Sequence, residues 1–237
     1  MEDTDSGAQA QGGNGIVVES RKVTKIYASR STQISALDEV DFAVKRGEIV
    51  AVRGSSGSGK TTLINVLSGL DSATSGEVLL GGRNILDFGD NALTTFRARH
   101  MGFIFQSFNL LPVLSALENV EFAAILAGRR ASQARHMAKE KLELVGLADR
   151  MSHKPAELSG GQQQRVTVAR ALVNEPEIVW ADEPTGNLDS TNEREIMDLI
   201  VQLNRDNNQS FVMVTHSTEV ASIAHRTVTM VDGRVAS

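Results

Sequence analysis

Short apolar runs bounded by turn residues recur along the chain, and they predict strands. The first two are expected to pair as an antiparallel layer, because apolar and polar residues alternate within the second of them. The later runs are almost entirely apolar, which is typical of strands buried inside a sheet. The predicted strands are 16–19, 34–44, 48–52, 75–82, 101–105, 178–181 and 211–214.

Apolar residues recur at helical spacing in several other stretches, and this spacing predicts helices. Two of these, 115–128 and 132–146, lie between predicted strands and therefore form an inserted helical lobe over 107–160. Residues 1–15 have no periodic apolar pattern and are expected to be a disordered tail, which leaves 16–237 as the folded domain. The other predicted helices are 62–67, 91–99 and 163–174.

Composition narrows the class of protein. A chain of 237 residues is long enough for one large domain or a domain with an inserted lobe, and its net charge of −5 gives no global basic field for nucleic acid or an anionic membrane. The absence of cysteine excludes disulfides, thiolate metal sites and cysteine nucleophiles. No run approaches ~20 apolar residues and no signal-peptide pattern begins the sequence, so we expect a soluble chain that is not exported.

The central motif lies between strand 48–52 and helix 62–67, where the sequence reads GSSGSGKT. Its glycines let successive N–H groups converge, and the following helix adds the positive end of its dipole, so the turn is an anion nest suited to a triphosphate. Lys60 is expected to reach the β- and γ-phosphates and Thr61 to ligate Mg²⁺. A flexible linker is the alternative, but a linker would not lie between a strand and an amphipathic helix. The predicted phosphate contacts are Gly54, Ser55, Ser56, Gly57, Ser58, Gly59, Lys60, Thr61 and Thr62.

Polar residues follow three of the buried strands, at the carboxyl ends where open α/β sheets bind ligands. Asp182 and Glu183 are adjacent and are expected to point to opposite faces, so that Asp182 holds Mg²⁺ through water while Glu183 polarises an attacking water. Gln106 offers an amide that can meet Mg²⁺ or that water, although a Gln at such a position is more often a loop residue. His216 places an imidazole at the same edge of the sheet.

Two further features are each open to two interpretations. Ser159 and Gln162 have the spacing of a helix capping box, whereas the adjacent Gly160 and Gly161 favour a backbone that lies against a phosphate. Tyr27 can stack on adenine, or it can be a half-buried packing residue at a strand end.

In this order, the motifs resemble those of the nucleotide-binding subunit of an ATP-binding cassette (ABC) transporter. The resemblance implies an α/β P-loop NTPase fold with a RecA-like mixed-sheet core, an N-terminal antiparallel β layer and an inserted α-helical signature subdomain. The matching motifs are the aromatic residue Tyr27, the Walker A loop 54–61, the Q-loop residue Gln106, the signature 158–162, the Walker B acids Asp182 and Glu183, the D-loop 186–189 and the switch residue His216.

The resemblance also implies roles for single residues. Glu183 would be the general base, His216 would hold the γ-phosphate and the water in place, and Asp189 would link the site to the opposite one. Trp180 departs from the aliphatic residue that is usual at its position. We interpret it as core packing on the strand face that it shares with Asp182.

Cofactors and partners follow from the resemblance as well. It implies ATP and Mg²⁺, a head-to-tail homodimer with two composite sites, and a separate transmembrane permease subunit. The chain would lie peripherally on the cytoplasmic side of the inner or plasma membrane and contact the membrane through the permease only. It is similar to the lipoprotein-release and macrolide-exporter branch (LolD/MacB-like), which acts on lipoproteins, lipids, peptides or drugs. The alternative is a nucleotide-switched regulator of a cell-division membrane complex (FtsE-like).

The loop after Gln106 carries four apolar residues, which are Phe108, Leu110, Leu111 and Pro112. The resemblance puts a cytoplasmic helix of the membrane subunit against this loop, whose connection to Gln106 suits it to transmit site occupancy. The alternative is that the four side chains belong to the core of the helical lobe.

Overall fold

The computed structural model describes residues 15–28 and 33–236. The disordered tail expected over 1–15 thus lies outside the described residues except for Gly15. The strands are β1 (Ile16–Ala28), β2 (Gln33–Lys45), β3 (Ile49–Gly54), β4 (Ser75–Leu80), β5 (Arg83–Asn84), β6 (Met101–Phe105), β7 (Ile178–Asp182), β8 (Ser210–Val214), β9 (Arg226–Val231) and β10 (Arg234–Ala236). The α-helices are α1 (Lys60–Leu67), α2 (Asp90–His100), α3 (Ala116–Leu126), α4 (Ala131–Leu144), α5 (Gly160–Leu172), α6 (Ser190–Asn207) and α7 (Thr218–Ser222).

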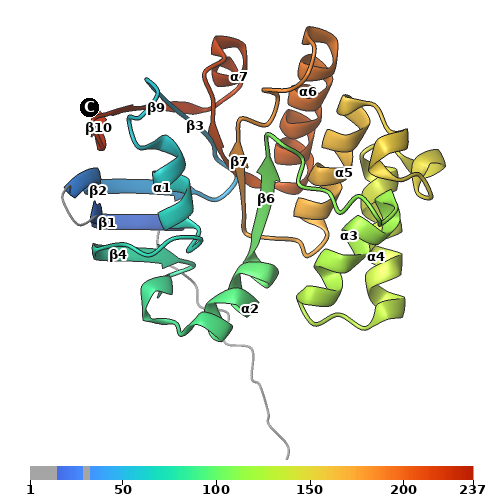
Figure 1. Ribbon diagram of the computed structural model, residues 1–237, viewed down its shortest axis with the longest axis horizontal. Coiled ribbons are helices and arrows are strands. Elements are labelled where there is room, and N and C mark those ends of the chain that lie inside the picture. The colour runs from blue at the N-terminus through green and yellow to red at the C-terminus, as the bar shows by residue number, and fades with distance from the viewer. Residues whose placement is uncertain (1–14, 29–32, 237) are drawn as a thin grey trace, which may run out of the picture.

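The strands form two sheets of different kinds. One is antiparallel, with the order β2-β1-β4-β5, and the other has the order β10-β9-β3-β8-β7-β6. Neighbours in the second sheet are parallel except for the pair β10 and β9. The antiparallel layer and the mixed sheet expected from the sequence are therefore confirmed. Figure 1 shows the antiparallel sheet and the helices α3 and α4 at opposite ends of the molecule, with the mixed sheet between them.

β1 is longer than the sequence pattern predicts. Register shifts and a φ of 47° at Lys22 interrupt the alternation in the middle of the strand. Beyond them, Lys25 occupies a buried position where an apolar residue would be expected. The sequence pattern therefore does not reveal the second half of β1. Tyr27 lies in this half and pairs with Ile34 of β2.

The mixed sheet is covered on both faces, and its strands distribute their side chains by alternation. Trp180 and Val212 belong to a buried cluster with α1 and the antiparallel sheet, whereas Val179 and Phe211 belong to a second cluster with α5 and α6. Trp180 is 1% exposed. Its expected role in core packing is confirmed.

The helical lobe packs α3 and α4 against α5, and the second buried cluster runs without a break from this lobe to the sheet. α5 begins at Gly160, earlier than the predicted start at residue 163, because Ser159 caps it. The Ser159 hydroxyl accepts the Gln162 N–H at 3.3 Å, and Gln162 Oε1 accepts the Ser159 N–H at 3.0 Å. The glycines of the signature are thus the first helical residues rather than a loop before the helix.

The close contact between β6 and α5 gives a stability prediction. A Cβ atom on Gly102 would overlap the carbonyl oxygen of Ala171, which cannot move without shifting α5. We expect Gly102→Ala to lower the free energy of unfolding by about 1–3 kcal/mol, as overpacking typically does. Thermal denaturation followed by circular dichroism measures this loss.

Gly89→Ser is the control for that experiment. Gly89 has open space around it and a φ of −69° at the N-cap of α2, where serine is a favoured residue. This variant should melt at or above the wild-type temperature. A Gly102→Ala variant that melts like the wild type would show that β6 and α5 tolerate the extra methyl group.

Candidate active site

Four neighbouring parallel strands end at the same edge of the mixed sheet. Their register pairs Phe105 with Asp182, Asp182 with Val214, and Val214 with Val52. The residues that follow these strands surround a cavity of about 330 Å³, called the edge cavity below. Of the predicted site residues, it brings together Ser56, Gly57, Gly59, Lys60, Thr61, Thr62, Gln106, Asp182, Glu183 and His216.

The loop between β3 and α1 curls around a lysine ammonium. Gly57 and Gly59 have φ values of 80° and 99°, and a Cβ on Gly59 would lie 2.5 Å from a backbone carbonyl oxygen of β2. Lys60 is buried, and its Nζ donates to the carbonyl oxygens of Gly54 at 3.0 Å and Ser55 at 2.8 Å. The geometry is that of a phosphate-binding loop, because its positive group lies at the start of a helix.

α1 begins without a side-chain cap. Its N-cap is Gly59, and its first turn holds no acidic residue. α2 and α4 likewise have no side-chain cap, whereas Ser115, Ser159 and Asp189 accept N–H groups at the starts of α3, α5 and α6. The first N–H groups of α1 therefore lack the internal acceptor that those helices have, and the helix dipole favours an anion in that place.

Asp182 and Glu183 line the same cavity, so the expectation that they point to opposite faces was wrong. β7 ends at Asp182, and Glu183 adopts a φ of 48°, so that strand alternation no longer applies. Burial raises the pKa of Asp182, while Lys60 and Thr61 oppose this shift by favouring the carboxylate. Asp182 is thus associated with the start of α1, whereas Glu183 is free to interact elsewhere in the cavity.

Glu183 lies beside the histidine. His216 Nε2 is 3.4 Å from Glu183 Oε1, and the His216 backbone N–H donates to Oε2 at 3.4 Å. Glu183 Oε1 is buried and accepts no hydrogen bond from the residues that the structure describes. The carboxylate therefore keeps an unused acceptor next to the imidazole.

Gln106 is held by the segment that follows the two acids. Asn187 Nδ2 donates to the Gln106 carbonyl oxygen at 2.9 Å, and Gln106 Nε2 donates to Asn187 Oδ1 at 3.5 Å. A Cβ on Gly186 would lie 2.7 Å from that same Nε2. The sequence assigned no individual role to Asn187, because the contact joins residues 81 positions apart and no local pattern reports it.

The signature residues lie outside the edge cavity. Ser159 and Gln162 form the capping box that their spacing predicts. A Cβ on Gly161 would overlap the side chain of Asn192 in α6, whereas a Cβ on Gly160 would meet no atom of the described residues closer than 3.5 Å. Packing within the chain thus explains Gly161 and leaves Gly160 without a structural reason. The other predicted site residues outside the lining are Tyr27, Gly54, Ser55, Ser58 and Asp189.

Asp189 acts as the N-cap of α6. Its carboxylate accepts the N–H groups of Thr191 at 3.0 Å and Asn192 at 2.9 Å, and the Asn192 side chain donates to it at 2.7 Å. These hydrogen bonds lower the pKa of Asp189. The carboxylate is therefore engaged within its own chain.

Tyr27 lies next to the edge cavity without lining it. Its strand partner Ile34 is a lining residue, and the tyrosine itself is 44% exposed and belongs to neither buried cluster. Its hydroxyl donates to Asp71 at 2.7 Å. The ring therefore lies outside the core, with part of its surface open to a ligand.

Comparisons with known proteins agree with this geometry. A model of the ABC transporter family matches residues 37–186. The chain is 45% identical to the uncharacterized ABC transporter ATP-binding protein YbbA of Escherichia coli (strain K12), covering 92% of this chain and 96% of the relative. It is also 45% identical to the lipoprotein-releasing system ATP-binding protein LolD of Geobacter metallireducens, covering 92% and 97%. The ATP-binding cassette MJ0796, solved as a dimer in a post-hydrolysis state bound to ADP and Pi, superposes with a TM-score of 0.85 at 42% identity, covering 93% of this chain and 97% of that chain.

The two signature glycines give a paired prediction. Gly161→Ala should lower the free energy of unfolding by about 1–3 kcal/mol, because the new methyl group must push Asn192 away from Asp189. Gly160→Ala, one position earlier in the same helical turn, should stay within about 0.5 kcal/mol of the wild type. Chemical denaturation of both variants measures the difference. Equal losses would mean that both glycines are needed for packing.

Proposed function

The chain belongs to the ABC transporter family as an ATP-binding subunit that hydrolyses ATP, and on that premise we propose that two copies close head-to-tail around two ATP molecules and drive a separate transmembrane subunit. One observation carries the proposal. The edge cavity gathers the phosphate loop, both acids and the histidine, while Gly160 lies outside it with no packing reason to be glycine. A second copy would supply that glycine to the open side of the cavity.

In this proposal the loop binds the phosphates of ATP, and Tyr27 contacts its adenine base. Lys60 would exchange its two carbonyl partners for oxygens of the β- and γ-phosphates, and the uncapped N–H groups of α1 would bind the same phosphates. The ring of Tyr27 would stack on adenine from beside the cavity.

Three oxygen-bearing side chains of the edge cavity fit Mg²⁺. They are Thr61, Gln106 and Asp182, and Mg²⁺ is commonly held by one or two protein oxygens together with substrate phosphates. When bound, the ion neutralises charge on the phosphates. The position of Asp182 near Thr61 and Lys60 suits this role, because both neighbours favour its charged form.

The remaining pair of side chains suits the attacking water. Glu183 Oε1 has an unused acceptor, and the imidazole of His216 lies 3.4 Å away. Glu183 would take the proton of the water as general base, and His216 would hold the water and the γ-phosphate in place. Hydrolysis would separate the two copies. The transmembrane subunit would then respond to a closed and an open state of the dimer.

Glu183→Gln tests these assignments. The amide cannot accept the proton, so hydrolysis should fall by about 10²–10⁴-fold, whereas ATP should still bind because Lys60 and the loop are intact. Sedimentation should show an ATP-dependent dimer for Glu183→Gln and a monomer for Lys60→Ala. Wild-type turnover in Glu183→Gln would remove Glu183 as the base, and a dimer that forms without ATP would contradict closure around the nucleotide.

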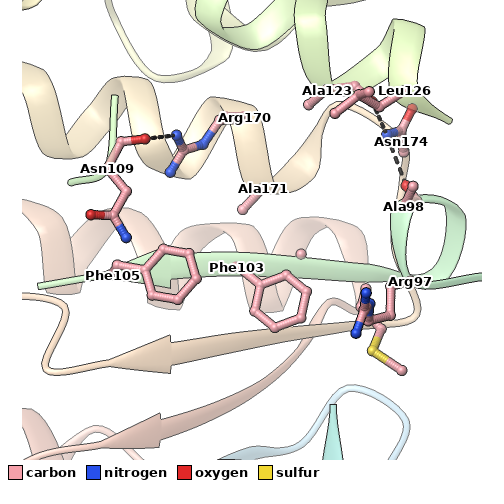
Figure 2. Close-up of a pocket in the computed structure, with 12 residues that line it drawn as sticks. Arg97, Ala98, Phe103, Phe105, Asn109, Ala123, Leu126, Arg170, Ala171 and Asn174 are labelled. Atoms are coloured by element: carbon pink, nitrogen blue, oxygen red, sulfur yellow. Dashed lines mark hydrogen bonds between the residues drawn. The ribbon is translucent and has the colours of Figure 1, made fainter. Parts of the chain in front are cut away.

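A second cavity, of about 250 Å³, lies between β6 and the helical lobe and is called the lobe groove below. Figure 2 shows Phe103 and Phe105 of β6 on one side, Ala123 and Leu126 of α3 on another, and Arg170 of α5 above the aromatic rings. An apolar groove of this kind suits the end of an amphipathic helix. We propose that the transmembrane subunit docks here.

Arg170 connects the lobe groove to the loop after Gln106. Its guanidinium donates to the carbonyl oxygens of Asn109 at 2.6 Å and Phe108 at 2.8 Å, and the first of these bonds is drawn in Figure 2. Phe108 and Asn109 have φ values of 57° and 50°, so the arginine holds a conformation that these residues rarely adopt. A change in the loop would thereby reach α5, which begins at Gly160.

The apolar residues of that loop divide between the two interpretations given above. Leu110 packs partly buried against the second core cluster, which matches the core interpretation. Leu111 is 42% exposed and Val113, two residues later, is 74% exposed, which leaves them free for a partner. Leu110 is therefore unsuitable for testing the docking surface, and Leu126 is the better choice.

Leu126→Glu should disrupt docking without harming the fold. Leu126 is 62% exposed and lines the lobe groove, so a carboxylate there stays hydrated in the free subunit but opposes an apolar partner. We expect the melting temperature and the basal ATPase rate of the wild type. The permease that copurifies with the wild-type chain should no longer copurify with this variant or stimulate its ATPase. Leu144→Glu, on α4 and 43% exposed, is the matched control and should behave like the wild type. A Leu126→Glu variant that still bound and responded to the permease would place docking elsewhere.

The structure contains, over residues 15–28 and 33–236, no helix that could span a bilayer. From the family we propose a peripheral position on the cytoplasmic side of the membrane, with the permease as the only membrane contact. The substrate class would be a lipoprotein, lipid, peptide or drug. The relationship to a lipoprotein-releasing subunit supports this class. Steady-state ATPase of the isolated chain and of its complex with the permease tests whether hydrolysis is coupled to transport.

A further inference from the structure

A carboxylate at the end of the phosphate-loop helix holds Tyr27 by its hydroxyl group. Asp71 Oδ2 accepts the Tyr27 Oη–H at 2.7 Å, and Oδ1 accepts Lys25 Nζ at 2.7 Å and the Ser72 N–H at 2.8 Å. Lys25 Nζ also donates to the Ser72 carbonyl oxygen at 2.7 Å and lies 4.8 Å from the centroid of the Tyr27 ring. These four residues are called the Asp71 cluster below.

The cluster joins two elements that are distant in the sequence. Lys25 and Tyr27 are two residues apart on β1 and therefore lie on the same side of the strand. Asp71 follows α1, and its own N–H donates to Asn65 of that helix at 3.0 Å. The tyrosine is thus tied to the segment that follows α1, the helix whose first residues we propose to bind phosphate.

Charge within the cluster is matched. Lys25 is only 8% exposed, and a buried ammonium is costly unless it is paired and fully hydrogen-bonded. Asp71 and Ser72 provide this pairing. Burial acts to raise the pKa of Asp71, but the hydrogen bonds from Lys25, Tyr27 and Ser72 together outweigh burial and lower it, so the carboxylate that accepts the tyrosine hydroxyl stays charged.

The ring that this cluster holds would otherwise be free to rotate. At 44% exposure, Tyr27 has little packing to select one rotamer, and the bond to Asp71 provides that selection. With the Lys25 ammonium over the ring, the face away from it is the one open to a planar ligand. A ring fixed before binding loses less conformational freedom when the ligand arrives.

We propose that Asp71, together with Lys25, is a positioning residue that holds the Tyr27 ring in the orientation that stacks on the adenine base. This inference rests on the proposed role of Tyr27 in ATP binding. Asp71 acts only through the tyrosine, and it does not touch the phosphates. Its effect is therefore confined to ligands that carry a base.

The test compares ADP with pyrophosphate, each with Mg²⁺, by calorimetric titration. Asp71→Asn and Tyr27→Phe should each weaken ADP binding by about 3–10-fold, the usual effect of losing one hydrogen bond of this kind, and should leave pyrophosphate binding unchanged. In a Tyr27→Ala background, Asp71→Asn should have no further effect on ADP. Steady-state assays should show a raised KM for ATP with kcat unchanged, because stacking is equal in the ground and transition states.

Asp206→Asn is the control. Asp206 pairs with Arg205 at 2.9 Å at the end of α6, and the variant should bind both ligands like the wild type. Equal weakening of ADP and pyrophosphate would show that Asp71 only maintains the fold. Wild-type ADP affinity in Asp71→Asn, or an additive effect in the Tyr27→Ala background, would also overturn the inference. If the wild-type chain bound ADP no better than Tyr27→Ala does, the proposed stacking by Tyr27 would itself be wrong.

Discussion

Backbone hydrogen bonds between β3, β8, β7 and β6 fix where each of these parallel strands ends, and the rest of the site depends on that alignment. A shift of one strand by one residue would carry its acid or histidine away from the edge cavity and turn every side chain to the other face. The two buried clusters oppose such a shift, because Trp180 and Val179 each fit only one side of the sheet. The packing that stabilises the fold therefore also sets the geometry of the site.

Features that depend on neighbours in the chain could be predicted from the sequence. The phosphate loop and the strand ends at Asp182 and Gln106 follow from local spacing, and the mixed sheet follows from the resemblance that these motifs carry. The structure contains all three. Features that depend on distant contacts could not. The bulge in β1, the left-handed backbone of Glu183 and the overlap of Gly161 with Asn192 arise only when separate segments meet, so that no periodicity reports them.

α5 contacts several parts of the molecule that bear on the proposed function. It begins at the signature, packs closely on β6 and holds the loop after Gln106 through Arg170. In its middle, the buried Gln164 donates to the carbonyl oxygen of Pro184, directly after the two acids, and accepts a bond from Thr167. Because close-packed interiors transmit displacements, a shift of α5 would be felt in each of these regions.

The two carbonyl partners of Lys60 have a consequence for the balance between stability and affinity. The ammonium is buried and bonded to backbone oxygens of its own chain, so its dehydration belongs to folding and not to binding. An incoming phosphate then replaces two neutral acceptors with a charged one, and the lysine itself has little water left to lose. The cost of burying this positive charge is therefore part of the folding free energy and does not reduce the affinity for nucleotide.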